Sequence, residues 1–334
     1  MKAMMASDTC FSTVCGRLGS VLNTDGVQRN EIDPVEARKA FDFVIERRQS
    51  YDERGVAVPG QYHLIKTSDL SFIPSCGVGR RYTPIQHSSV YDFIVERILP
   101  NFDGMRLETV GTMYGCGIGV VSATVGDEFR LPGDSSPMSS RLVFANPCNG
   151  RGSLVLGASM VRKAFQTQVS AGVRDAEREG FVVRHTRNAC FHLEGALKAL
   201  RGRVEALSAL RRRAERLAET EVDSDFLVRV LDRVYPVGRF SPGTAGATRT
   251  ANLRDDVIEQ FEAGETALTM TGKTAWTAFN ALAFPIFNPR SLTSRTDYAD
   301  ISYGGMVGDR ADRVAGWFRI VEETAFGRAG EGAA

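Results

Sequence analysis

The stretch LEGALKALRGRVEALSALRRRAERL, residues 193–217, decides the fold of this chain. Its apolar residues recur three or four positions apart, which is close to a coiled-coil heptad with one skipped step. This spacing predicts a long amphipathic helix over about residues 188–221. The apolar stripe has two candidate partners, a sheet of the same chain or a second subunit.

Upstream of this helix, the pattern alternates between helices and strands. Asp33-Pro34 and the apolar residues after it predict a helix over about residues 34–50, and residues 89–100 predict another that stops at Pro100. Short β-prone stretches predict an antiparallel sheet, and they are residues 62–67, 71–74, 107–125, 141–146 and 153–159. We therefore expect an α+β fold: a curved antiparallel sheet packed with helices, including one long helix, plus a small helical C-terminal part.

Composition shifts along the chain predict where its parts begin and end. Residues 132–139 are predicted to form an exposed loop, and Pro and Gly at 236–250 predict a mobile linker. We expect five parts, which are an N-terminal arm (1–30), an α+β core with the long helix (31–235), the linker (236–250), a helical C-terminal part (251–326) and a disordered tail (327–334).

Composition limits the class of protein. Of the 334 residues, 43% are hydrophobic and 24% charged, which is typical of a globular chain, and the net charge is only +1. No apolar run is long enough for a signal peptide or a membrane span, so we expect a cytoplasmic protein that does not bind membranes. In that reducing compartment the six cysteines are expected to be free thiols.

Short motifs do not indicate a catalytic, cofactor or metal site. Gly272-Lys273-Thr274 lacks the earlier glycine of a phosphate-binding loop, because Ala267 stands there, so the triplet is interpreted as a helix start. The histidines and cysteines lack zinc-ligand spacing, although a site assembled only in three dimensions stays open. We therefore predict no catalytic residue, no cofactor and no metal from the sequence.

Basic residues gather around the long helix. Between Arg184 and Arg216 there are nine Lys or Arg against three acids, a marked local excess in a nearly neutral chain. Such a cluster predicts contacts with a phosphate backbone, unless it is only the solvated face of a helix. The candidate nucleic-acid-binding residues are Arg162, Lys163, Arg184, Arg187, Lys198, Arg201, Arg203, Arg211, Arg212 and Arg213.

Several segments, taken in order, resemble the phage/plasmid-like protein family, a mobile-element domain of unknown function. They are Arg81-Tyr82-Thr83-Pro84-Ile85-Gln86, Asn149-Gly150-Arg151-Gly152-Ser153, Arg184-His185-Thr186, and the segment from Thr274 to Ala281. The resemblance covers roughly residues 35–320 and implies a phage or plasmid setting. It implies no established activity.

Three functions are compatible with these patterns. The first hypothesis is a non-sequence-specific single-stranded DNA-binding protein, acting as a homo-oligomer and as a strand-annealing recombination factor. It requires the arginines of the long segment to converge on one positive surface without acidic partners. The alternatives are a protein-interaction or host-takeover factor without nucleic-acid binding, and an enzyme whose site forms only in three dimensions.

Overall fold

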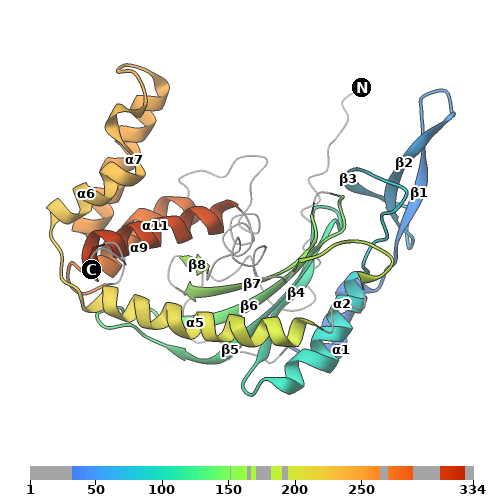
Figure 1. Cartoon of the computed structure of the whole chain (residues 1–334), viewed down its shortest axis with the longest axis horizontal. Coiled ribbons are helices and arrows are strands. Elements are labelled where there is room, and N and C mark those ends of the chain that lie inside the picture. Colours follow the sequence, from blue (N-terminus) through green and yellow to red (C-terminus); the bar gives the residue numbers. More distant parts are fainter. Residues whose placement is uncertain are drawn as a thin grey trace, which may run out of the picture. The chain divides into compact units, whose positions relative to one another are not determined.

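The computed structural model describes residues 32–150, 152–163, 167–170, 182–189, 195–263, 270–288 and 309–327. Antiparallel sheets and helices make up this part of the chain, so the predicted α+β class is confirmed (Figure 1). The chain forms two compact units, each drawn from three separate stretches. Unit 1 comprises residues 1–126, 142–157 and 175–202, and unit 2 comprises residues 127–141, 158–174 and 203–334.

The predicted helix over 34–50 is wrong beyond its first turns. Helix α1, Pro34–Arg38, begins where Asp33 accepts a hydrogen bond from the Val35 amide at 2.8 Å, and a short 3-10 turn, Lys39–Phe41, ends it. The following residues form strand β1, Ile45–Tyr51. Pairing with a neighbouring strand outweighs the local helical spacing here, because helix propensity is only a weak preference.

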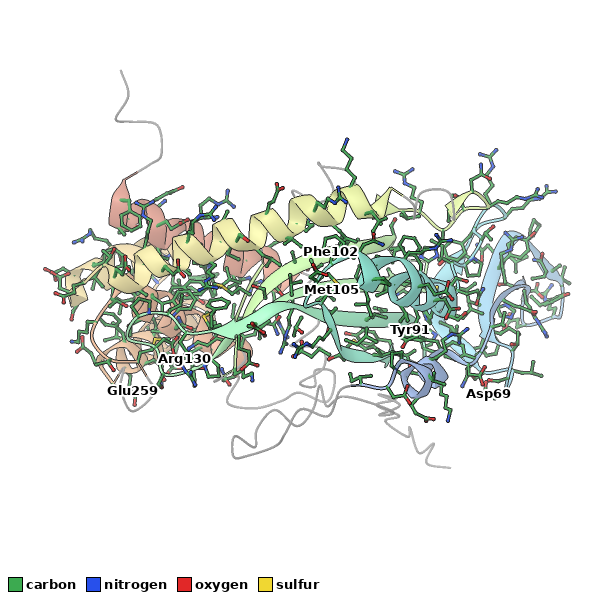
Figure 2. All side chains as sticks on the ribbon, turned by 90° about the horizontal axis from the view of Figure 1, so that it is seen from below. Asp69, Tyr91, Phe102, Met105, Arg130 and Glu259 are labelled. Carbon is green, nitrogen blue, oxygen red and sulfur yellow. The ribbon has the colours of Figure 1, made fainter. Side chains whose placement is uncertain are left out.

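A three-stranded antiparallel sheet with the order β1-β2-β3 belongs to unit 1 (Figure 1). Strand β2 is Ala57–Lys66 and β3 is Phe72–Val78, which confirms the predicted antiparallel start near residues 62–74. The turn between these two strands carries Asp69 (Figure 2). One face of the sheet buries a small core made of Ile45, Leu64, Ile73, Val78 and Cys148.

The second predicted helix is present with altered geometry. Helix α2, His87–Phe93, continues as a π-helical turn over Ile94–Ile98 and a 3-10 turn over Leu99–Asn101. Tyr91 on α2 (Figure 2) donates a hydrogen bond from its hydroxyl to the Pro34 carbonyl at 2.7 Å, and this bond ties α2 to α1.

The larger sheet has the strand order β4-β5-β6-β7-β8, with β9 paired to β7. Its strands are β4 Arg106–Met113, β5 Ile118–Phe129, β6 Met138–Pro147, β7 Leu154–Arg162, β8 Gln168–Ser170 and β9 Val182–Val183. From β4 to β8, strands that follow one another in the sequence are also neighbours in the sheet, which is the arrangement of a β-meander. Strands β5, β6 and β7 each contribute residues to both units.

Helices build the core of unit 2 around Trp276, which stacks on Phe279 with ring centroids 5.3 Å apart. They are the second part of α5 (Ala196–Glu219), α6 (Ser224–Val234), α7 (Ala245–Glu262), α9 (Ala275–Phe287) and α11 (Asp309–Phe326) (Figure 1). Leu207, Leu210, Ala214 and Leu217 of the α5 stripe are buried within this single chain. The stripe therefore packs in the core of its own chain.

The connection between α6 and α7 is shorter than the linker predicted over residues 236–250. A 3-10 turn, Val237–Arg239, follows α6, and the hydroxyl of Thr244 caps α7 by accepting from the Ala247 amide at 3.3 Å. Residues 245–250, expected to be linker, are the first turns of α7. The predicted arm (1–30) and residues 328–334 of the predicted tail lie outside the described residues.

None of the helices in the described part of the chain combines the length and the apolar character that a membrane crossing requires.

Candidate nucleic-acid interface

Four of the ten predicted cations carry acidic partners within unit 2. Each guanidinium or ammonium group lies against a carboxylate, in the pairs Arg162–Asp134, Lys163–Glu128, Arg211–Glu215 and Arg213–Glu322. A cation already neutralised by a carboxylate must lose that contact before it neutralises a phosphate. The requirement of one positive surface over the whole long segment is therefore not met.

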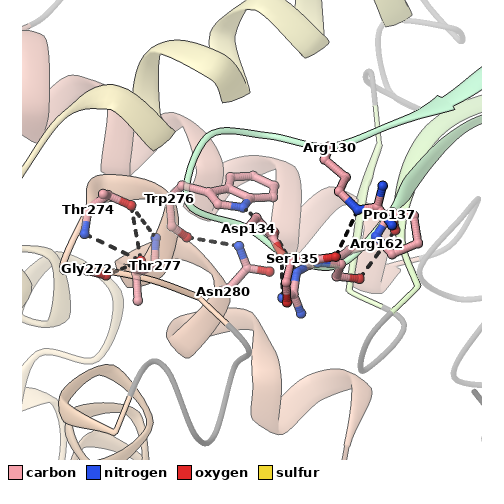
Figure 3. A network of polar contacts seen from close by, with 11 residues as sticks. Arg130, Asp134, Ser135, Pro137, Arg162, Gly272, Thr274, Trp276, Thr277 and Asn280 are labelled. Carbon is pink, nitrogen blue, oxygen red and sulfur yellow. Dashed lines mark hydrogen bonds and ion pairs between the residues drawn. The ribbon is translucent and has the colours of Figure 1, made fainter.

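Arg162 is fully buried, so it does not face a ligand at the surface. Its Nε and Nη2 atoms each donate to Asp134 at 2.8 Å, and the Trp276 indole donates to the same carboxylate at 3.0 Å (Figure 3). The Ser136 amide adds a fourth hydrogen bond at 2.9 Å. The pair satisfies the hydrogen-bonding needs that make a buried charge tolerable. The predicted exposed loop over 132–139 is thus wrong at Asp134, which is 4% exposed.

Three arginines of α5, two of which also form the ion pairs given above, lie over aromatic rings of unit 2. The guanidinium of Arg211 lies 4.2 Å from the ring centroid of Phe129, that of Arg213 lies 5.1 Å from Phe318, and that of Arg216 lies 4.4 Å from Phe326. Arg203 is buried. Arg212 is exposed and forms no ion pair with a described residue. The contacts of Arg211, Arg213 and Arg216 with these rings stabilise the fold, since arginine side chains pack well on aromatic rings.

The remaining predicted cations all belong to unit 1. Arg184, Arg187, Lys198 and Arg201 are exposed, and none of them forms an ion pair within the described part of the chain. Lys198 and Arg201 lie one turn apart at the start of α5. A separation of three residues places two side chains on one face of a helix.

Two further arginines join this group through a backbone contact. The Thr83 amide donates to the His185 carbonyl at 3.1 Å. This bond sets Arg80 and Arg81, just before Thr83, on a segment adjoining Arg184 and Arg187. All four arginines are exposed and lack an acidic partner among the described residues. We call Arg80, Arg81, Arg184 and Arg187, with the backbone that joins them, the basic junction.

The basic junction is held in place from within unit 1. Arg47 directs its Nη1 atom at the carbonyls of Gly79, Arg80 and Tyr82, with 2.9 Å to Tyr82. The Tyr82 ring stacks on His185, with centroids 5.0 Å apart and an interplanar angle of 19°. Arg47 therefore fixes the loop that carries Arg80 and Arg81.

Ile85 is the centre of a buried polar cluster beneath the junction. Its amide donates to His185 Nδ1 at 3.1 Å, and its carbonyl accepts from Asn146 Nδ2 at 2.8 Å and from the Cys148 thiol at 3.1 Å. Asn146 Nδ2 also donates to His87 Nδ1 at 2.9 Å. On its other side, His87 donates from Nε2 to the Cys116 carbonyl at 2.9 Å.

Both imidazoles in this cluster are neutral. Each Nδ1 atom accepts a hydrogen bond, which is open only to a ring nitrogen without a proton. Desolvation by burial lowers the pKa of His87 to about 4, and the same cause, with His87 as a like-charged neighbour, lowers the pKa of His185 to about 4. The fold therefore stabilises the uncharged rings.

Cys148, His87 and Asn146 do not form an activated nucleophile. Burial raises the pKa of the Cys148 thiol, which keeps its proton and donates it to Ile85. A reactive cysteine needs a thiolate beside a base. Here the Cys148 sulfur lies 4.0 Å from His87 Nδ1, an atom that already accepts from Asn146.

The Gly272-Lys273-Thr274 triplet starts a helix, as predicted. Thr274 caps α9 by accepting from the Thr277 amide at 3.2 Å, and the two threonine hydroxyls lie 3.1 Å apart (Figure 3). Lys273 pairs with Glu262. Across the described residues, no group of three or more His, Cys, Asp or Glu side chains is arranged to hold a metal ion.

The ten predicted residues did not include Arg80 and Arg81. Their signal was the pair of adjacent arginines before Tyr82, but the sequence separates them from Arg184 by about a hundred residues. The contacts of His185 with Tyr82, Thr83 and Ile85 reveal that the two basic segments adjoin.

A family model described as "Domain of unknown function (DUF932)" matches residues 76–295, which include every member of the basic junction. Searches of the curated proteins and of the solved structures found no significant match.

Proposed function

Since the chain belongs to the DUF932 family, an uncharacterised domain family, we propose from its own site that it binds single-stranded DNA without sequence specificity through the basic junction. The observation that carries the proposal is the set of four exposed arginines on two adjoining segments, without acidic partners in the described part of the chain. Arginine forks match phosphate oxygens in two-point contacts.

The proposed contacts are to the backbone of the nucleic acid. Lys198 and Arg201 add two exposed charges within the same unit. Tyr82, half-buried and next to Arg81 in the sequence, stacks one face of its ring on His185, and a base stacking on its other face would favour a single strand.

Titration of a labelled deoxythymidine oligonucleotide at several salt concentrations tests the proposal. With six phosphate contacts, the slope of log affinity against log salt for a single strand is about −4, because each contact contributes about −0.7. Replacing Arg80, Arg81, Arg184 and Arg187 by glutamine is expected to bring the slope to about −1 and to weaken binding at low salt.

A matched control removes the same net charge elsewhere. Arg211, Arg213, Arg233 and Lys273 are each paired with a carboxylate in unit 2, so their replacement by glutamine is expected to change affinity far less. The proposal is wrong if wild-type protein shows no binding at low salt, or if both quadruple variants lose affinity equally.

We propose that the setting is a phage or plasmid in the cytoplasm of its host, with strand annealing by a homo-oligomer as the activity. The ordered segments from Arg81 to Ala281 support this setting through their resemblance to mobile-element proteins. Mixing complementary labelled strands with the protein measures annealing, and sedimentation with and without DNA measures the oligomeric state. A monomer that does not accelerate pairing would limit the function to binding alone.

A further inference from the structure

His185 contacts both halves of the basic junction. Its carbonyl accepts from the Thr83 amide at 3.1 Å, its Nδ1 atom accepts from the Ile85 amide at 3.1 Å, and its ring stacks on Tyr82. The residues that it holds therefore lie directly after Arg80 and Arg81. His185 itself lies between Arg184 and Arg187.

We infer that His185 is a positioning residue of the basic junction, and that its ring helps to hold Arg80 and Arg81 beside Arg184 and Arg187 in the neutral form but not in the protonated form. Mildly acidic solution would then disassemble the DNA-binding site. This consequence for binding rests on the proposed function, but the positioning role does not.

Protonation has a specific structural effect here. A proton on His185 Nδ1 would face the Ile85 amide hydrogen, so a hydrogen bond would become a repulsion between two donors. His185 is 5% exposed, and water cannot readily take over the solvation of the charged ring.

The groups around the ring oppose a charge on it. Tyr82 covers one face, and a proton on His87 would add a like charge nearby. The exposed cations Arg184 and Arg187 flank it in sequence. The Pro147 carbonyl favours the charged ring, but its effect is smaller than that of burial.

This inference predicts a pH profile opposite to that of simple ion pairing. Arginine stays protonated and phosphate stays ionised between pH 5 and 8, so contacts between them alone give a flat profile. Protonation of acidic groups nearby would strengthen binding at low pH. A loss of affinity on acidification therefore indicates a change in the protein structure.

Fluorescence anisotropy with a labelled deoxythymidine oligonucleotide, at constant ionic strength, measures the profile. We expect wild-type affinity to be lower at pH 5.0 than at pH 7.5, by up to about thirtyfold, because opening of the site returns the pKa of His185 from about 4 to its ordinary value of 6.5. His185→Asn, whose Oδ1 atom is placed as Nδ1 is and does not titrate, is expected to accept from the Ile85 amide, to retain affinity at pH 7.5 and to lose most of the pH dependence. His185→Ala is expected to bind weakly at both pH values.

His63→Asn is the matched control. His63 belongs to unit 1, on strand β2, where it contacts Phe72 and Ser50 and does not touch the basic junction. It should retain the wild-type profile. The inference is overturned if wild-type affinity is the same at both pH values, or if His185→Asn loses affinity at pH 5.0 as wild type does.

Hydrogen exchange provides a readout that needs no nucleic acid. After correction for intrinsic rates, peptides covering residues 80–90 should lose protection between pH 7 and pH 5 in wild type but not in His185→Asn. Protection that depends on pH in this way, without any DNA binding, would retain the positioning role and reject the proposed function. Equal protection of both proteins at all pH values would reject the positioning role.

Discussion

At position 162, an arginine is neutralised inside the fold by Asp134, which also accepts from the Trp276 indole. Its charge is therefore unavailable for a ligand, whereas the next residue, Lys163, is partly exposed and pairs with Glu128 at 2.5 Å. Two neighbouring cations in one segment thus contribute very differently to stability. Burial, which the sequence pattern does not encode, causes the difference.

Arg162→Met is expected to destabilise unit 2 by about 3–5 kcal/mol, because it leaves the Asp134 carboxylate buried without its cation. Urea unfolding measures the loss. Lys163→Met, which breaks a partly exposed pair, should cost no more than about 1 kcal/mol. Equal losses in the two variants would contradict the role given to burial.

Gly119 of β5 makes room for the His87 ring. A Cβ atom at this position would lie 2.5 Å from His87 Nδ1, so Gly119→Ala must displace the ring. We expect a loss of about 1–3 kcal/mol from overpacking, with exposure of the Cys148 thiol to labelling reagents. Gly79→Ala, where a Cβ would meet no atom within 4 Å, is the control, and it should leave Cys148 protected.

At the scale of elements, long periodic segments were predictable and short ones were not. The α5 stripe recurs over many turns, so its helix and its buried side are clear from the sequence alone. The segment after Phe41 gave a helical signal over a few residues, but pairing of Ile45 with Lys66 made it a strand. Tertiary pairing overrides weak local propensity, and a single sequence does not reveal the partner.

Gly202 in the exposed part of α5 weakens that helix. A methyl group added at this position would meet no atom within 4 Å, and the backbone here needs no positive φ. Gly202→Ala is therefore expected to raise the free energy of unfolding by about 0.5–1 kcal/mol, as alanine restricts the unfolded chain. Thermal unfolding followed by circular dichroism measures the gain, and a decrease would indicate a contact at this position.

At the scale of the molecule, the two units interleave along the chain, since β5, β6, β7 and α5 contribute to both. The predicted division into a core, a linker and a C-terminal part uses continuous stretches of sequence. It could not anticipate units that are each drawn from three separate stretches. Prediction of the candidate site met the same difficulty, because the site joins segments that are distant in the sequence. The sequence predicted Arg184, Arg187, Lys198 and Arg201 but not Arg80 and Arg81. Contacts over long sequence distances determine which cations remain exposed.

Stability is expected to fall in acid because His87 and His185 are buried in their neutral form. Their pKa values of about 4 in the fold lie below the ordinary value of 6.5, so the unfolded chain binds protons first. The stabilisation is complete above pH 6.5 and is lost as the pH falls toward 4, by up to about 1.4 kcal/mol per pH unit for each histidine. Urea midpoints across this range measure the loss.

The double variant His87→Gln/His185→Gln is the comparison for this profile. Its stability should depend less on pH between 6.5 and 4, even if it is lower at neutral pH. A double variant with the wild-type slope would show that other groups, such as carboxylates, dominate the acid response.

Arg47, which fixes the carbonyls of Gly79, Arg80 and Tyr82, has a kinetic consequence. A loop that is already ordered before encounter has no folding step to complete when a ligand arrives, so capture of a strand would proceed at a rate set by diffusion and charge. Without the hydrogen bonds of Arg47, the loop would first have to become ordered, and the association rate constant would be lower.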